Sequence, residues 1–250
     1  MRDDAPDAAA RLNEAGHPVG DAPVYEVNAR VAARLSTLET PAAVMAVFPL
    51  PAAPALGELR SPEAAGARAP HDPQPSPPLV VYADRLADPG NLGTLVRAAA
   101  AFAAAALVAS PGSVDLFSPK VARASMGAVF ALPLDQGIEI ERVVDELRPA
   151  AVFGLVAHGG RPLDEVASTG GSGPVLLCVG AERAGLSAAT LAVVTERVTI
   201  PLAAAAGPAI ESLNAGVAGA IALYEFSRRP AGAARAKDGA GPSGPAPQKE

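Results

Sequence analysis

The chain has 250 residues, half of them hydrophobic, and a formal net charge of −6. This length allows one large domain, or one medium domain with extensions. The single Cys178 excludes an internal disulfide, argues against an all-cysteine metal site, and is expected to be a thiol buried in a strand. The acidic balance argues against a chain-wide RNA-binding surface but allows a local basic cleft, with Arg97, Lys120 and Arg123 as candidates. Because no signal peptide or membrane-length apolar run is present, we expect a cytoplasmic protein.

The N-terminal part shows little capacity for a core. Residues 1–22 are rich in Ala, Asp and Pro, which predicts disorder. Apolar residues at helical spacing predict a helix over Val24–Leu35, and Val44–Leu50 is expected to be a strand. This pair is too small to bury a core alone. The proline density of Pro51–Pro78 then predicts a linker.

From Leu79 onward the pattern alternates between strands and helices. The expected strands are Leu79–Tyr82, Ala106–Ala109, Val129–Leu132, Ala151–Val156, Val175–Val179 and Val198–Ile200. The expected helices are Asn91–Phe102, Pro119–Ala124, Glu139–Leu147, Ala188–Val193 and Ser212–Arg228. Such alternation predicts an α/β fold, with a parallel sheet and helices on both faces. Residues 229–250 are expected to be a disordered tail.

The last expected helix carries a stripe of larger apolar side chains. Leu213, Val217, Ala220, Ile221 and Tyr224 recur at helical spacing, so they share one side of the helix. Just before this helix, Ser212 and Asn214 form a polar pair between two hydrophobic elements. Polar groups in such a place need partners, which indicates a site.

Two further polar segments follow expected strands, where parallel sheets bind ligands. In Asp88–Ala98, Asn91 suits a helix N-cap, and Arg97 suits either a phosphate or a surface ion pair. In Val179–Leu186, Gly180 allows close approach of a ligand, while Glu182 could serve a site or form a solvated pair. Ser212 is equally explained as a cap, and Asn214 as a surface residue. The sequence shows no metal cluster, phosphate loop or nucleophile elbow.

Four motifs in order nevertheless make a specific pattern. They are DPGNLGTLVR at Asp88–Arg97, RASMGA at Arg123–Ala128, GAERAGL at Gly180–Leu186, and Ile200-Pro201 followed by Ser212-Leu213-Asn214. With these motifs, Leu79–Arg228 resembles the SpoU-type, or TrmH-like, RNA 2′-O-ribose methyltransferases of the SPOUT superfamily. The segment before the linker resembles the end of that family's N-terminal RNA-binding domain. The chain would thus divide into a remnant of that domain at 1–50, a linker at 51–78, a methyltransferase domain at 79–228 and the tail.

The resemblance implies a fold, a cofactor and an assembly. The parallel sheet would carry a C-terminal trefoil knot, with S-adenosylmethionine bound in it, and the protein would be a homodimer with active sites at the interface. The implied cofactor-binding residues are Gly180, Ile200, Leu202 and Leu213. The implied catalytic residues are Asn91, Arg97, Glu182, Ser212 and Asn214. RNA would contact Arg97, Lys120 and Arg123, and no metal is implied. The loop at 202–211 is longer than is usual in the family.

The implied activity is methyl transfer to a ribose 2′-hydroxyl, with rRNA as the first expected substrate and tRNA as the second. Arginine stays protonated in proteins, so we expect Arg97 to hold an RNA phosphate while a phosphate oxygen or water takes the hydroxyl proton. Glu182 could fix backbone amides of its loop or face RNA. The alternatives are a catalytically idle RNA-binding relative and a nucleotide-binding α/β enzyme of another type.

Overall fold

The computed structural model describes residues 6–14, 20–36, 39–42, 44–61, 77–167, 173–203 and 212–228. The chain divides into two compact units, Met1–Pro49 and Leu50–Glu250, each described by itself below. The tail expected at 229–250 and most of the loop at 202–211 lie outside the described residues.

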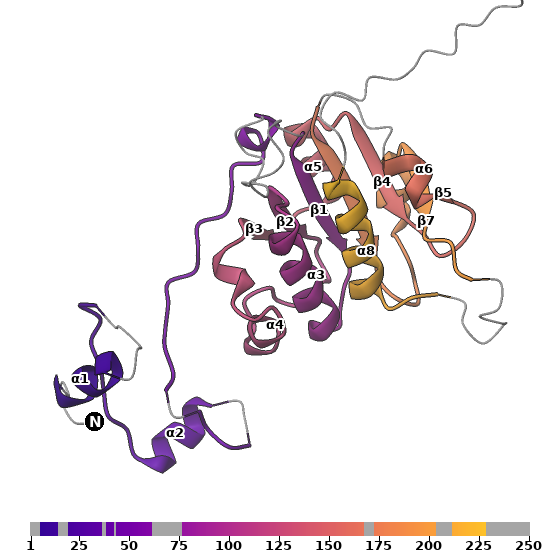
Figure 1. Ribbon diagram of the computed structural model, residues 1–250. Coiled ribbons are helices and arrows are strands. Elements are labelled where there is room, and N and C mark those ends of the chain that lie inside the picture. The colour runs from indigo at the N-terminus through magenta and orange to yellow at the C-terminus, as the bar shows by residue number, and fades with distance from the viewer. Residues whose placement is uncertain are drawn as a thin grey trace, which may run out of the picture. The chain divides into compact units, whose positions relative to one another are not determined.

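The N-terminal unit contains two short helices, α1 (Pro6–Glu14) and α2 (Ala29–Leu35) (Figure 1). The disorder expected for residues 1–22 is therefore wrong for α1. Asn28 caps α2 by accepting a hydrogen bond from the Val31 amide, so the helix begins later than predicted. The strand expected at Val44–Leu50 is also wrong, because these residues form neither a helix nor a strand. No residue of α2 is buried.

The second unit is built on a seven-stranded sheet whose order is β3-β2-β1-β6-β4-β7-β5. The strands are β1 (Leu79–Asp84), β2 (Ala106–Ala109), β3 (Leu134–Gln136), β4 (Ala151–Leu155), β5 (Arg161–Pro162), β6 (Val175–Gly180) and β7 (Glu196–Thr199). Every neighbouring pair is parallel. This confirms the predicted α/β class with a parallel sheet.

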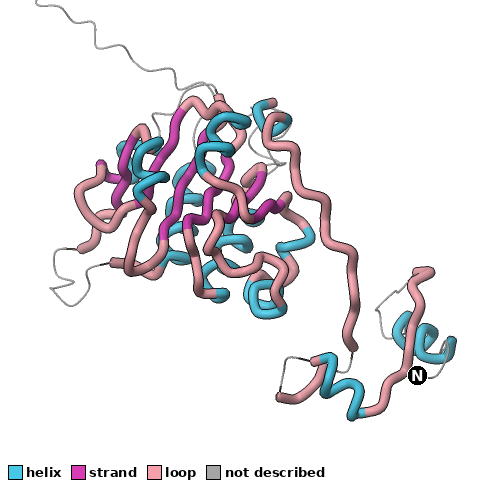
Figure 2. The backbone as a smooth tube through the Cα atoms, turned by 180° about the vertical axis from the view of Figure 1, so that it is seen from behind, coloured by secondary structure: helices cyan, strands magenta, loops and turns pink. Residues whose placement is uncertain are grey.

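Helices cover both faces of the sheet (Figures 1 and 2). They are η1 (Glu58–Arg60), α3 (Pro89–Ala101), α4 (Pro119–Ala124), η3 (Ala128–Phe130), α5 (Ile140–Leu147), α6 (Leu163–Ala167), α7 (Ala188–Val193) and α8 (Ala215–Ser227). Alternate residues of β1 supply two cores, because successive side chains of a strand point to opposite faces. Val81 and Ala83 pack in the core with α3 and α8, whereas Val80 and Tyr82 pack in the core with α5.

Helix α8 buries a different face from the stripe noted in the sequence, and this face includes Leu223 and Phe226. The buried side of α8 includes Gly216, Gly219 and Ala222, and a Cβ at Gly219 would lie 2.4 Å from a Leu95 methyl carbon. These small residues let α8 approach α3 closely. As a result Val217 and Ile221, on the stripe noted in the sequence, are exposed.

Some of the predicted bounds of helices and strands match the structure, and others do not. The predicted bounds of β2, α4 and α7 match the structure. The strand predicted at Val129–Leu132 is wrong: that stretch holds the turn η3, which follows Gly127 at φ +87°, and the strand β3 begins only at Leu134. Cys178 lies buried in β6 as predicted, and burial raises the pKa of its thiol.

The segment expected to be a linker contains local structure. Glu58–Arg60 forms the single turn η1, and Leu56 and Leu59 are buried in the core that also contains α5 residues. Apolar burial therefore extends upstream of β1. Residues 62–76 of the same segment lie outside the described residues.

Candidate functional site

Helix α3 is the first helix after β1, and its N-cap is not Asn91. The Asn91 side chain is therefore available for other contacts. Asp88, rather than the predicted Asn91, is the N-cap: its Oδ1 accepts a hydrogen bond from the Asn91 amide nitrogen at 2.8 Å. Pro89 follows in the first turn, where a missing amide hydrogen costs nothing. Asn91 is only 7% exposed, so its side-chain amide must find partners inside the protein.

Those partners come from the two other polar segments singled out in the sequence. Asn91 Nδ2 donates to Glu182 Oε1 at 2.9 Å, and Asn91 Oδ1 accepts from Asn214 Nδ2 at 2.7 Å. Asn214 Nδ2 also donates to Glu182 Oε1, again at 2.7 Å. Three residues separated by up to 123 positions therefore form one closed polar network, called here the amide–carboxylate network.

Asn214 is held in place from its other end as well. Asn214 Oδ1 accepts from the Val217 amide nitrogen at 3.1 Å, which makes Asn214 the N-cap of α8. Ser212, whose alternative reading was a cap, precedes the helix and is exposed. Because each amide in the network is bonded through both its oxygen and its nitrogen, the side chains are held in one arrangement.

The loop that carries Glu182 is folded back tightly on β6. A Cβ at Gly180 would lie 2.4 Å from the Gly185 carbonyl carbon, so only glycine fits there. The Gly185 amide donates to the Ala181 carbonyl at 2.8 Å, and Gly185 has φ +65°. These backbone features, rather than a contact with loop amides by Glu182 itself, give the loop its shape.

A pocket of about 160 Å³ opens at the carboxyl ends of β4, β6 and β7. Its lining includes all four residues expected to bind a cofactor: Gly180, Ile200, Leu202 and Leu213. Glu182 and Ser212 line it too. Sequence reasoning missed Leu155, Val156 and Ala157, although the carboxyl end of the expected strand at 151–156 could have pointed to them.

The basic candidates lie outside the pocket. Arg97 is exposed on α3, and it forms no hydrogen bond or ion pair within the part of the chain that the structure describes, so the surface ion pair considered above is absent there. Lys120 and Arg123 are exposed positions on α4. The structure therefore brings Asn91, Glu182 and Asn214 together but leaves the basic residues on the surface.

The described residues contain neither a metal-binding cluster nor a membrane-spanning helix. Among them, no group of three or more His, Cys, Asp or Glu side chains is arranged to hold a metal ion. No helix in the described ranges is both long and apolar enough to cross a membrane.

Fold and site together define an α/β protein with a ligand pocket at the carboxyl edge of a parallel sheet. More narrowly, the chain belongs to the SpoU rRNA Methylase family, whose model matches residues 78–224. This confirms the resemblance drawn from the four motifs. The 23S rRNA (guanosine(2553)-2′-O)-methyltransferase RlmP of Bacillus subtilis is 36% identical over 149 residues, which cover 59% of this chain and 57% of RlmP.

Solved structures give the same assignment. The SpoU methyltransferase AviRb from Streptomyces viridochromogenes, in complex with the cofactor AdoMet, aligns with a TM-score of 0.55 and 32% identity, covering 62% of each chain. An AdoMet-bound rRNA methyltransferase from Sinorhizobium meliloti aligns with a TM-score of 0.54 and 33% identity, covering 63% of this chain and 58% of that one. The chain spans about half the length of the curated relatives it matches, 48–57% of the first four.

Proposed function

We propose that this protein is an S-adenosylmethionine-dependent RNA methyltransferase that methylates a ribose 2′-hydroxyl, with rRNA as the first candidate substrate and tRNA as the second. One observation carries the proposal: Glu182 belongs both to the amide–carboxylate network and to the pocket lining. Three of the five residues that the resemblance names as catalytic thus adjoin the four that it names as cofactor-binding. The names of RlmP and of the AdoMet-bound neighbours support this chemistry.

The pocket suits the proposed cofactor. Leu155, Ile200, Leu202 and Leu213 make much of its lining apolar, which favours a flat purine ring. Glu182 adds a carboxylate, which favours a ligand with positive charge. We propose that Gly180, Ile200, Leu202 and Leu213 hold the cofactor in a C-terminal trefoil knot.

The protein's part in the reaction is then to bind and orient. S-adenosylmethionine, when bound, supplies a methyl group activated by the attached sulfonium. Arg97 stays protonated and binds an RNA phosphate next to the target ribose through its forked N–H donors. Ser212 orients the ribose, and a phosphate oxygen or water accepts the hydroxyl proton. The amide–carboxylate network keeps the pocket loops in register, so that the reacting groups meet in line.

Lys120 and Arg123 extend the proposed RNA surface. Both lie on α4, which packs against α3: a Cβ at Gly93 would lie 2.4 Å from Ala124 Cβ. Gly93 therefore lets α4 come close to the helix that carries Arg97. Neutralising phosphates is the main sequence-independent source of RNA affinity, and it requires only this local basic surface despite the acidic chain.

The assembly that fits the exposed face of α8 is a homodimer. Val217, Ile221 and Tyr224 leave an apolar stripe on that face, and a second copy of the chain is its proposed occupant. A Cβ at Gly216 would lie 3.0 Å from Thr94 Cβ, and the Tyr224 ring packs on Phe102 at 5.7 Å between centroids, so α8 runs alongside α3. Arg97 lies between those two contacts on α3, which would put it beside the dimer interface.

Calorimetry with S-adenosylmethionine tests the proposed function directly. We expect binding with a Kd well below millimolar, followed by transfer of a labelled methyl group to ribosomal RNA, with ribose methylation mapped in a deletion strain. Binding without transfer to either RNA would favour the catalytically idle relative. Absence of binding at millimolar cofactor would contradict the proposal.

A further inference from the structure

A buried carboxylate lies at the end of β1, on the side of the sheet away from α3. Asp84 is the last residue of this strand and is only 2% exposed. Strand alternation puts its side chain on the same face as Val80 and Tyr82, where α7 also packs. Burying a carboxylate is costly unless it accepts strong hydrogen bonds, so its partners show what it holds.

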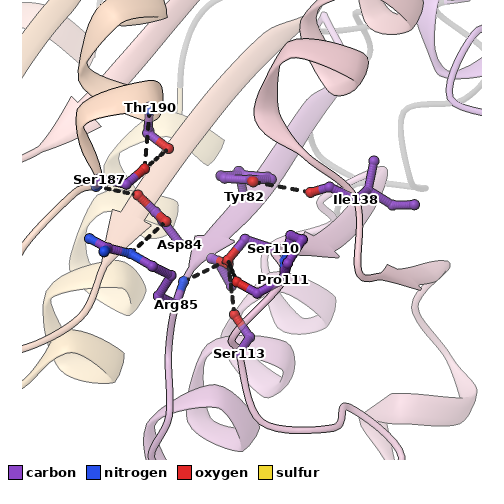
Figure 3. A network of polar contacts seen from close by, with 10 residues as sticks. Tyr82, Asp84, Arg85, Ser110, Pro111, Ser113, Ile138, Ser187 and Thr190 are labelled. Carbon is purple, nitrogen blue, oxygen red and sulfur yellow. Dashed lines mark hydrogen bonds and ion pairs between the residues drawn. The ribbon is translucent and has the colours of Figure 1, made fainter.

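Asp84 has two partners: the neighbouring Arg85, and Ser187 at the end of the loop that carries Glu182. Asp84 Oδ2 accepts from the Ser187 backbone nitrogen at 2.6 Å, and Oδ1 lies 3.4 Å from Arg85 Nε (Figure 3). Ser187 is the N-cap of α7, with its own hydroxyl accepting from the Thr190 amide. The Asp84 carboxylate therefore accepts a hydrogen bond from the backbone at the point where the loop ends and α7 begins.

Asp84 also adjoins the point where the same loop starts. In the parallel pairing of β1 with β6, Asp84 is the register partner of Gly180. The sheet fixes the loop at Gly180 and the Asp84 carboxylate fixes it at Ser187, so both ends are held at one residue. Between these anchors lies Glu182, which bonds Asn91 and Asn214.

We propose that Asp84 is a positioning residue for the cofactor site: it closes the loop Gly180–Ser187 so that Glu182 reaches the amide–carboxylate network. Asp84 is absent from the pocket lining and bonds none of the three network residues, so it acts through the loop. The proposal rests on the proposed function for its cofactor readout, but its structural readout does not depend on any ligand.

The rest of the polar cluster around Asp84 provides controls. The Tyr82 hydroxyl donates to the Ile138 carbonyl at 3.1 Å, and Ser110 Oγ accepts from the Arg85 amide at 2.7 Å (Figure 3). These bonds join β1 to its neighbours on the β2 side and leave the loop Gly180–Ser187 untouched. Tyr82→Phe should therefore lower stability without changing the loop.

The test compares Asp84→Ala with Asp84→Asn, and Ser187→Pro with Ser187→Ala. Asp84→Ala removes the acceptor and Ser187→Pro removes the donor, so each should speed amide exchange across residues 180–186 and weaken S-adenosylmethionine binding about tenfold. Asp84→Asn keeps an acceptor oxygen and should recover most of the affinity. Ser187→Ala keeps the backbone donor and loses only the cap, so its affinity should match that of the wild type.

The outcomes separate the two proposals. If the wild type fails to bind S-adenosylmethionine, the proposed function fails, while amide exchange in the loop still tests the anchoring role. If Asp84→Ala is folded and shows wild-type exchange and affinity, the anchoring role is wrong. Should Asp84→Ala not fold, Ser187→Pro decides: unchanged exchange and affinity overturn the role. If Ser187→Ala and Ser187→Pro lost the same amount of cofactor affinity, the loss would come from the α7 cap and not from the bond to Asp84. This result would also overturn the role.

Discussion

Two regions around α3 and α8 differ in how their side chains are partnered. The inner site consists of Asn91, Glu182 and Asn214, and the outer face consists of Arg97, Val217, Ile221 and Tyr224. In the inner site, Asn91, Glu182 and Asn214 bond one another, and each amide is used at both ends. On the outer face, Arg97 has no partner within the described residues, and the side chains of Ile221 and Tyr224 are exposed. Among the described residues, the polar groups of the inner site bond one another, whereas the outer face leaves a charge and apolar side chains exposed.

This difference separates two kinds of residue. Those of the inner site are preorganised, so their loss should be felt in cofactor binding even without RNA. Those of the outer face are expected to act only when RNA or a second copy is present. Cofactor affinity, turnover and oligomeric state can therefore be measured as distinct properties of the two regions.

The largest effect is expected from Glu182→Ala. The change removes the shared acceptor of Asn91 Nδ2 and Asn214 Nδ2. Asn214 is exposed and still donates to Asn91 Oδ1, but the buried Asn91 Nδ2 is left unsatisfied, at a cost of about 1–3 kcal/mol. We expect S-adenosylmethionine affinity to fall roughly 100-fold by calorimetry. Glu182→Gln, which keeps an acceptor oxygen, is the matched control and should lose less. Wild-type affinity in Glu182→Ala would show that the network does not support the pocket.

Arg97→Lys should have the next largest effect, and on a different property. Lysine keeps the charge but loses the forked donors that bind a phosphate at two points, so turnover on RNA should fall about tenfold or more. The cofactor Kd should stay unchanged, because Arg97 lies outside the pocket. Arg183→Lys, at another exposed arginine, serves as the control. Near-wild-type turnover in Arg97→Lys would contradict the phosphate role.

Ile221→Glu should break the proposed dimer. A charge in the exposed apolar stripe of α8 cannot be buried against a second copy without a partner, so the dimer Kd should rise by about 10-fold to 100-fold. Sedimentation velocity measures this shift. Ala189→Glu, at an exposed position of α7 on the opposite face, should leave the dimer intact. A monomeric wild type would remove the interface altogether.

Gly216→Ala should have the smallest effect, at the junction of the two regions. Its Cβ would lie 3.0 Å from both the Asn91 carbonyl oxygen and Thr94 Cβ, so α8 must shift by a few tenths of an ångström. We expect about a threefold loss of cofactor affinity. The better helix propensity of alanine, about 1 kcal/mol, should keep the free energy of unfolding nearly constant. Calorimetry and chemical denaturation measure the two effects. Gly219→Ala, whose Cβ would lie 2.4 Å from a methyl carbon of the fully buried Leu95, should be more destabilising.

The sequence predicted the sheet well because its signals were local. The apolar strands β1 and β6 and the proline-initiated α4 could be identified within a few residues of their true ends. The strand β3 was missed because it has one buried residue, Leu134, and the turn η3 just before it looks equally apolar. The inward face of α8 depends on glycines whose role is close approach to α3, and hydropathy does not record close approach.

The candidate site was predicted less directly. No spacing rule joins Asn91 to Glu182, which are 91 positions apart; family resemblance alone grouped them. The structure adds how they are grouped. Asp88 caps α3 and so leaves the Asn91 amide available, while Asn214 is held in place as the cap of α8. Asp84 was not singled out, because a lone carboxylate at a strand end shows its partner only when the chain is folded.

The pairing of β1 with β6 has a consequence for how the protein folds. Leu79 is paired with Val175, so the two halves of the sheet are joined by a contact between residues nearly a hundred positions apart. Bringing the two ends of so long a segment together costs conformational entropy before the stabilising contacts can form. This entropic cost slows folding. The cofactor pocket needs β6, β7 and the start of α8, and its network needs Asn91 from α3. The site should therefore form in one of the last steps of folding, after the α3 region and the C-terminal strands have come together.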